Sequence, residues 1–330
     1  KTRVSEVAPW LKVGADFRAR VIRQDAVGLQ DRANVGVSAE ERFWQRFRTR
    51  LWATVTVPEM ENVSFNFRLV NESRNFCRPE GGAGGDERSW NCDETLFDKF
   101  NVRITDLFEE GITLTVGRQD FRLGSGWMFF EGTPMDGSRT IYFDAVRATI
   151  GMPDYKSTLD LIYIDQEPHN DRFIRPINNR DRQVASAHER GVIVYLENKS
   201  MEDMQVDGYF AWKHNMSRTS RGTPLRSTSD ADLYTVGVRV VGNYNESIQY
   251  DAEIAPQFGQ KDRRDNITAL GGRGRLTYSM QDEMDSAVYV DYEYRSGGKT
   301  TDESFDILWG RYPYFSEAYT AYIDGLEGAL

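Results

Sequence analysis

The chain has 330 residues, a formal net charge of -10 and only 39% hydrophobic residues, which is low for a soluble globular domain. Its 12% of aromatic residues argue against an intrinsically disordered chain, and no run of about 18 apolar residues is present to form a transmembrane helix. Residues 1–10 carry no apolar signal core, so we expect any export signal to have been removed already.

Polar and apolar side chains alternate through most of the chain. In residues 11–21, Leu11 and Phe17 share one parity, whereas Asp16 and Arg18 share the other. A period of two residues is that of a β-strand whose faces meet different surroundings. The same pattern predicts further strands at residues 43–57, 62–70, 96–104, 112–119, 141–150, 159–166, 190–197, 204–213, 233–241, 248–258, 270–280, 288–295 and 305–309. The pattern therefore predicts about 14 strands and no long helix.

Long and short connections alternate between these strands. The long polar connections are residues 24–41, 73–95, 120–138, 167–187 and 215–229, followed by the shorter 259–266 and 296–303. The tight turns lie near residues 58–61, 107–110, 152–155, 199–203 and 243–245. Outer-membrane barrels have short periplasmic turns and long extracellular loops, so this sorting favours such a barrel.

We therefore predict an all-β fold, a transmembrane antiparallel up-and-down β-barrel that forms one domain over residues 1–330. The apolar parity would face lipid and the charged parity a water-filled lumen, which needs no hydrophobic core and so explains the low apolar content. The sheet must close, because backbone groups in lipid have to be paired. The alternative is a soluble antiparallel sandwich, which does not explain charge on the polar parity of nearly every strand.

Charged residues of the inward parity are the candidate pore-lining residues. The basic ones are Lys12, Arg18, Arg20, Arg46, Arg48, Arg50, Arg68, Lys99, Arg103, Arg147, Arg239, Arg273 and Arg275, with Arg118 near the rim. The acidic ones are Asp16, Asp160, Asp207, Asp251, Glu253, Asp291 and Glu293. Early strands are mostly basic and later strands mostly acidic. Guanidinium groups stay charged in a wet pore, and a basic strip favours anions over cations.

The alternative for each of these arginines is an ion pair that only braces the wall. The cluster of Arg46, Arg48 and Arg50 beside Arg18 and Arg20 is harder to explain in this way. On those two strands, Asp16 is the only acidic residue that we assign to the inward parity. The cluster therefore indicates a channel that attracts anions.

Four sequence blocks together resemble a known family. They are RFRTRLWA (residues 46–53), VGRQDFRLGSG (116–126), YFDAVRATI (142–150) and RYPYFSEAYTAYIDG (311–325). In order and spacing they resemble successive blocks of the alginate-export family of outer-membrane porins. The resemblance implies a barrel of roughly 18 strands in a Gram-negative outer membrane, with an electropositive channel for an anionic polysaccharide or related sugar acids. It also implies pore-lining positions for Arg48, Arg50, Arg118 and Arg147, accompanied by Gln119 and Asp144.

The end of the sequence departs from this expectation. A barrel of that size would need about four more strands than the alternation predicts. Either the chain is a fragment of a longer barrel, or it closes with about 14 strands.

Two cysteines, Cys77 and Cys92, bracket a glycine-rich stretch in the second long connection. The oxidising surroundings of an outer-membrane loop favour a disulfide between them, worth about 3 kcal/mol in the chain-entropy model. Two free thiols are the alternative. A disulfide would pin this loop, which could then fold over the channel mouth as a lid.

Enzymatic and metal-binding patterns are weak. The histidines His169, His188 and His214 lie in or beside long connections, and no two have metal-ligand spacing on one element. We therefore expect no metal, no cofactor and no enzymatic activity. Acidic loop pairs, at residues 262 and 265 and at residues 302 and 303, would be calcium ligands in an alternative interpretation.

These observations predict an outer-membrane diffusion channel for anionic saccharides, with the lipopolysaccharide-containing bilayer and the saccharide as its partners. Strict alternation and the net charge of -10 argue against nucleic acid. One alternative is a scaffold barrel that anchors a periplasmic or surface protein. The other is an outer-membrane hydrolase in which His188 acts as a general base with a rim carboxylate. An ion current across a bilayer would distinguish the channel from both.

Overall fold

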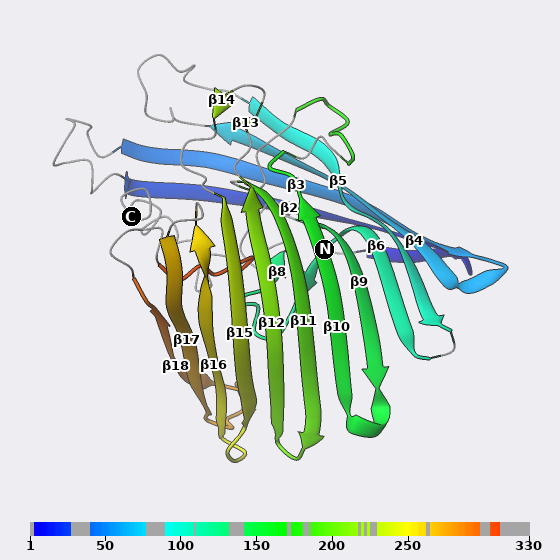
Figure 1. Cartoon of the computed structure of the whole chain (residues 1–330). Helices are drawn as coiled ribbons and strands as arrows, with labels where there is room; N and C mark the ends of the chain where they lie inside the picture. Colours follow the sequence, from blue (N-terminus) through cyan, green and yellow to red (C-terminus); the bar gives the residue numbers. More distant parts are fainter. Residues whose placement is uncertain are drawn as a thin grey trace.

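The fold is one large antiparallel sheet, seen in Figure 1 as a curved wall. The computed structural model describes residues 3–27, 40–76, 90–108, 110–131, 142–169, 173–180, 185, 187–216, 219–220, 223–224, 230–261, 265–297 and 304–310. Within them, 14 strands follow one another in chain order, and each pairs with the next strand of the sheet. Strands β1 and β18 are the two edges of the described sheet.

Most strands of this sheet are long enough to cross a bilayer. In chain order, the strands are β1 (Arg3–Ala8), β2 (Leu11–Val27), β3 (Glu40–Val57), β4 (Met60–Phe76), β5 (Trp90–Leu107), β6 (Ile112–Gln119), β9 (Phe143–Met152), β10 (Ser157–Gln166), β11 (His188–Met201), β12 (Met204–Met216), β15 (Ala231–Asn243), β16 (Ile248–Lys261), β17 (Asp265–Ser279) and β18 (Ala287–Arg295). Most of them exceed the nine to eleven residues or so that a tilted transmembrane strand needs.

The remaining elements are small. Strands β7 (Phe121–Arg122) and β8 (Phe130–Glu131) pair with each other, as do β13 (Thr219–Ser220) and β14 (Thr223–Pro224). A 3-10 turn, η2 (Pro153–Tyr155), joins β9 to β10. Among the described residues, no helix has the length and apolar character that a membrane crossing requires.

The predicted all-β antiparallel fold is confirmed, with two differences at its ends. Strand β1 was not predicted, because RVSEVA is short and alternates poorly. The predicted strand at residues 305–309 is wrong: this segment joins no strand of the sheet, and Trp309 forms only an isolated bridge with Phe129. A short apolar run fits both a strand and a buried irregular segment, so periodicity alone does not separate them.

Short and long connections lie at opposite rims of the wall. Because consecutive strands pair antiparallel, every second connection meets the same rim. Residues 202–203 join β11 to β12 at one rim, and the hairpins there lie at the lower edge of the upright strands in Figure 1. Residues 167–187 join β10 to β11 at the other. We call these the short-turn rim and the long-connection rim.

One face of the sheet exposes apolar side chains, and we call it the outer face. On β15, Val236 and Val238 are 43% and 45% exposed, whereas Thr235, which has the opposite parity, is fully buried. The same alternation exposes Phe17, Leu51, Val116, Val146, Leu161, Tyr163, Phe210, Ile254, Phe258, Leu270 and Leu276. A continuous apolar outer face over this many strands is typical of a lipid-facing wall.

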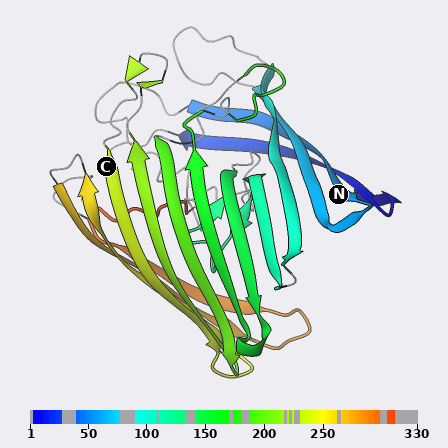
Figure 2. The same ribbon diagram turned by 45° about the vertical axis from the view of Figure 1, so that its right-hand side comes forward.

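The opposite, inner face carries two irregular segments, residues 120–131 and 304–310, which we call the inner segments. Phe121 stacks on Phe143 of β9, with ring centroids 4.1 Å apart, and Phe129 meets Tyr209 of β12 edge to face at 5.2 Å. Trp127 stacks on Phe305 at 5.6 Å, which joins the two segments. Figure 2 shows β7 and β8 on the concave side of the wall.

The inner segments and the wall form a hydrophobic core, so the predicted interior without such a core is wrong for this half of the sheet. The wall contributes inner-face residues that include Ile162, Ile164, Ile193, Ala211, Leu233, Ala255, Ile267 and Ala269. The prediction considered the charges of the inward parity. On β10 that parity also holds two isoleucines, which need an apolar cover.

The predicted disulfide is also not supported. Cys92 is a free cysteine and lies in β5, where Asn71 donates a hydrogen bond to its sulfur across 3.3 Å. Cys77, its expected partner, lies outside the described residues. The strand continues further toward the long-connection rim than the alternation indicated, so Cys92 belongs to the wall rather than to a loop.

Candidate functional site

Three rows of inner-face positions cross β2, β3 and β4. In register, the rows are Arg20, Arg46 and Arg74, then Arg18, Arg48 and Glu72, and then Asp16, Arg50 and Val70. Like charges directly opposite each other destabilise an antiparallel pair. Two rows in which arginine faces arginine are therefore not explained by strand pairing alone, and they mark this part of the wall as the candidate site.

Two carboxylates are shared among these arginines. Asp16 accepts from Arg50 Nε at 2.7 Å and lies 3.5 Å from Arg48 Nη2. Glu72 lies 2.9 Å from Arg46 Nη2 and 3.1 Å from Arg74 Nη2. Asp16 was the only acid assigned to the inner face of β2 and β3, and the neighbouring strand β4 supplies Glu72 as a second one. The arginines are thus braced and partly neutralised, and each carboxylate serves two of them.

A second basic group lies on β4 and β5. Arg68 donates to Asp98 at 2.7 Å and to Asp120 at 2.9 Å, and Lys99 lies 2.9 Å from Asp120. The register shifts between Arg68 and Leu69, so Asp98 and Lys99 both reach the inner face. Asp120 is the first residue of an inner segment, which the basic wall therefore anchors.

The two cations determine the charge of Asp120. Burial favours its neutral form, but Arg68 and Lys99 outweigh this and hold the pKa of Asp120 below its usual value. A carboxylate with a depressed pKa stabilises the fold above its unfolded pKa and loses that contribution as the pH falls through its folded pKa. The anchor of the inner segment is therefore complete at neutral pH.

Exchanging Asp120 for asparagine should remove this part of the acid sensitivity. We expect the D120N variant to unfold at a lower temperature than the parent chain at pH 7, and we expect the difference to shrink as the pH falls from about 4 through the lowered pKa of Asp120. Thermal unfolding in detergent micelles over this pH range measures the difference. A constant difference at all pH values would contradict an electrostatic anchor.

A pocket of about 330 Å³ lies between the two basic groups. Its lining includes Asp16, Arg50, Trp52, Thr54, Asn66, Arg68 and Lys99. Trp52 lies over Gly14, where an added Cβ would come within 2.4 Å of the indole. Guanidinium, ammonium, amide and indole groups around one pocket can hydrogen-bond a carboxylate and pack against a sugar ring.

Filling the space under Trp52 tests this arrangement. We expect Gly14→Ala to displace the indole and to lower the free energy of unfolding by about 1–3 kcal/mol, as overpacking does. Gly208→Ala is the matched control, because a Cβ there meets no atom within 4 Å. Thermal unfolding and tryptophan emission in detergent report the two effects. Equal behaviour of the two variants would show that Trp52 does not depend on Gly14.

The predicted residues of the later strands form a paired ladder on the inner face. Arg147 binds Asp160 through two hydrogen bonds of 2.8 and 2.9 Å, and Arg239 binds Asp251 at 2.8 and 3.0 Å. The other contacts of this ladder join Arg239 to Asp207, Arg273 to Asp251, and Arg275 to Asp291. These arginines brace the wall, as the alternative interpretation proposed.

Glu253 and Glu293 bind the inner segments. Ser125 donates to Glu253 at 2.9 Å, and Trp127 Nε1 donates to Glu293 at 2.7 Å. Tyr209 of β12 also donates to Glu253 at 2.9 Å. Two acidic groups predicted to face water therefore hold protein groups.

Arg103 and Arg118 lie apart from these groups. Arg103 is exposed on β5, toward the short-turn rim. Arg118 shares the parity of Val116, hence the outer face, and is fully buried. It binds Asp144 at 2.8 and 3.1 Å, and its guanidinium lies 3.8 Å from the centre of the Tyr142 ring. The structure therefore does not bring Arg118 together with the arginines of β2 to β4.

His188, the general base of the enzymatic alternative, is fully buried. It also lies on the outer-face parity, since its neighbour Glu189 reaches Lys213 and Trp309 on the inner face. This position gives the hydrolase interpretation no support.

Several residues of the candidate site were not predicted: Trp52, Glu72, Arg74, Asp98 and Asp120. Glu72 and Arg74 lie beyond the predicted end of their strand at residue 70, and Arg74 lies in a stretch treated as polar connection. Asp98 reaches the inner face through a bulge, which reverses the expected parity. Trp52 continues the inward parity of the three arginines, so that signal was present in the sequence.

The apolar outer face, the charged inner face and the up-and-down order of strands define a porin-like membrane sheet. Residues 9–326 match the Alginate export family, and the chain belongs to this family. The resemblance seen in the sequence is thereby confirmed. Family and fold together indicate a channel of the bacterial outer membrane.

Solved porin structures are similar to this chain at low identity. The Salmonella typhi OmpF complex with daunomycin is 10% identical, with 88% of this chain and 93% of that chain covered and a TM-score of 0.40. The copper transporter OprC is 14% identical, with 90% and 51% covered and a TM-score of 0.39. A mutant of the Rh. blastica porin is 11% identical, with 86% and 100% covered and a TM-score of 0.36. A comparison with curated protein sequences gave no match.

Proposed function

We propose that this protein is an anion-selective channel that passes anionic saccharides or sugar acids across the outer membrane by diffusion. The observation that carries the proposal is the set of arginine rows on β2, β3 and β4. Arginine opposite arginine weakens strand pairing, so a function that needs concentrated positive charge accounts for it better than stability does.

The pocket beside Trp52 supports the choice of substrate class. Arg50, Arg68 and Lys99 offer charged donors for a carboxylate, and Asn66 offers an amide for hydroxyl groups. Because these groups are shared with Asp16, Asp98 and Asp120, a sugar acid would compete with protein carboxylates and bind weakly. Weak, repeated binding suits diffusion through a channel.

The proposal includes a closed barrel with the long-connection rim outside the cell. The edges β1 and β18 each have one partner among the described strands, and backbone groups in lipid require a second. We infer that residues 1–330 belong to one barrel domain whose sheet is closed, and the family implies roughly 18 strands for such a barrel. Short periplasmic turns and long outer loops are the usual orientation of such barrels.

Planar-bilayer recording of the purified chain tests the function. A salt gradient should give a reversal potential on the anion side, and an oligosaccharide of uronic acids should reduce the current more than a neutral oligosaccharide of equal length. No ion current, or a preference for cations, would overturn the anion channel. Equal block by both sugars would overturn only the substrate class.

A further inference from the structure

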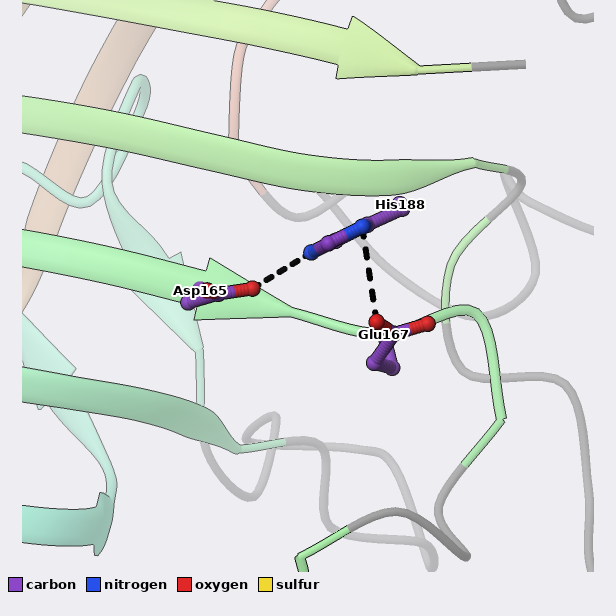
Figure 3. A group of neighbouring side chains, drawn as sticks. All are labelled: Asp165, Glu167 and His188. Atoms are coloured by element: carbon purple, nitrogen blue, oxygen red, sulfur yellow. Dashed lines mark hydrogen bonds and ion pairs between the residues drawn. The ribbon is translucent and has the colours of Figure 1, made fainter. Parts of the chain in front are cut away.

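A histidine and two carboxylates meet at the long-connection rim (Figure 3). Asp165 is near the end of β10, Glu167 follows the strand, and His188 is the first residue of β11. One ring nitrogen of His188 contacts the Asp165 carboxylate, and Nδ1 lies 3.4 Å from Glu167 Oε1. Donor atoms of the three side chains all lie within 4.8 Å of one another. The cluster thus joins two neighbouring strands across the start of their long connection.

The cluster opens on a pocket of the outer face. Tyr163 is 43% exposed on that face, and Asp165 follows at the same parity. A pocket of about 400 Å³ is lined by Tyr163, Asp165, Glu167 and Phe173, together with Asp144. Carboxylates therefore line its wall, and the imidazole of His188 lies fully buried behind them. Because the pocket includes Glu167 and Phe173 beyond the end of β10, it lies at the long-connection rim, and a small cation can reach the donors from the water there while the histidine is held in place.

The local charge favours a cation. The nearby guanidinium of Arg118 is committed to Asp144 by two hydrogen bonds, and Arg190 lies 3.5 Å from Asp165 at a half-exposed position. Asp165 and Glu167 both contact the imidazole of His188. Placing two carboxylates against a fully buried histidine costs free energy unless positive charge compensates the carboxylates.

A second histidine–aspartate pair at the same rim provides a comparison. His214 Nδ1 lies 2.8 Å from Asp232, across β12 and β15. Among the described residues, only the cluster of Asp165, Glu167 and His188 has two carboxylates close enough to a histidine for all three side chains to bind one metal ion. The two sites differ in the feature that a metal ion requires, which is a third donor.

We propose that Asp165, Glu167 and His188 bind a divalent transition-metal cation such as Zn²⁺. One nitrogen and two carboxylates suit zinc and related ions, and the remaining coordination positions would face the pocket. Such an ion would hold the connection between β10 and β11 against the rim. This inference does not depend on the proposed channel function.

Titration of the metal-stripped full chain with Zn²⁺ tests the proposal. The chain, without any histidine tag, is kept in detergent micelles, and calorimetry in two buffers of different ionisation enthalpy measures stoichiometry, Kd and proton release. We expect one site per chain, release of protons as the ion replaces the histidine–carboxylate contact, and a higher unfolding temperature with Zn²⁺. H188Q and E167Q should each weaken binding on the order of tenfold or more, as loss of a metal-site group does.

H214Q is the matched control and should leave the Kd unchanged, because its site has a single carboxylate. If H188Q fails to fold, E167Q decides the test, since Glu167 lies outside the paired strand residues. No saturable binding, or equal weakening by H214Q and E167Q, would overturn the proposal. Bilayer conductance is a separate readout, so loss of the metal site and loss of the channel function are distinguishable.

Discussion

Replacing Arg46, Arg48 and Arg50 with serine is expected to lower the anion-over-cation permeability ratio several-fold. A unit charge about 8 Å from a passing ion changes its energy by about 0.5 kcal/mol in water, so three unscreened charges change the population of each ion by roughly tenfold, in opposite directions for anions and cations. Salt screening and the contacts with Asp16 and Glu72 reduce this effect. The reversal potential in a salt gradient across a planar bilayer measures the change.

Two further variants identify its cause. Exchange of the same three arginines for lysine keeps the charge, so the ion selectivity should stay near that of the parent chain. Binding of a uronic-acid oligosaccharide should still weaken, because lysine lacks the planar fork of guanidinium donors. Arg275→Ser removes one cation from the paired ladder on β17 and should have the smallest effect. An unchanged reversal potential in the triple serine variant would show that these arginines do not line the ion path.

The strands were predictable because each one lies between two different surroundings. Phe17 and Leu51 face outward, whereas their neighbours Asp16 and Arg50 face inward. Apolar and charged side chains therefore alternate with a period of two residues along each strand. The ends of the fold were less predictable. Strand β1 is too short to show a period, and residues 305–309 are apolar because they cover the inner face, not because they span the wall.

The sequence predicted that most arginines of the candidate site face inward, but it did not predict their ion-pair partners. Arg46, Arg48 and Arg50 follow from alternation alone, whereas their contact with Glu72 depends on the register between β3 and β4. That register is a tertiary property, set over 26 residues of chain. The inward position of Asp98 depends on a bulge, and the contact of Asp120 with Arg68 depends on the path of an inner segment. Neither feature produces a periodic pattern in the sequence. The sequence placed His188 beside a rim carboxylate, but it did not identify Asp165 and Glu167 as the carboxylates or predict a metal site.

The inner segments also change how the net charge of -10 bears on an anion channel. They lie on β9 to β18, where Glu253 and Glu293 bind Ser125 and Trp127. Lys213 of β12 donates to the Leu308 carbonyl at 2.8 Å, which fixes the second segment. Acidic groups of the later strands are thus covered, whereas the arginine rows of β2 to β4 lie on a different part of the wall. An acidic protein can therefore present a basic path.

Trp127 is the residue on which both inner segments depend. Its indole is 2% exposed, stacks on Phe305 and donates to Glu293. We expect Trp127→Ala to remove about 3–5 kcal/mol of packing and to release residues 120–131 from the wall. The expected results are a lower unfolding temperature in detergent and a higher single-channel conductance, because the released segment no longer narrows the path.

The same release should reduce anion selectivity, since Glu253 and Glu293 would then face the ions that pass. Tyr155→Ala is the control: this residue is 70% exposed in the turn η2, and its exchange should alter neither conductance nor selectivity. A lower unfolding temperature with unchanged conductance would show that the inner segments brace the wall without narrowing the channel. Higher conductance together with a shift toward cations would show that the inner segments narrow the path and shield its acidic half.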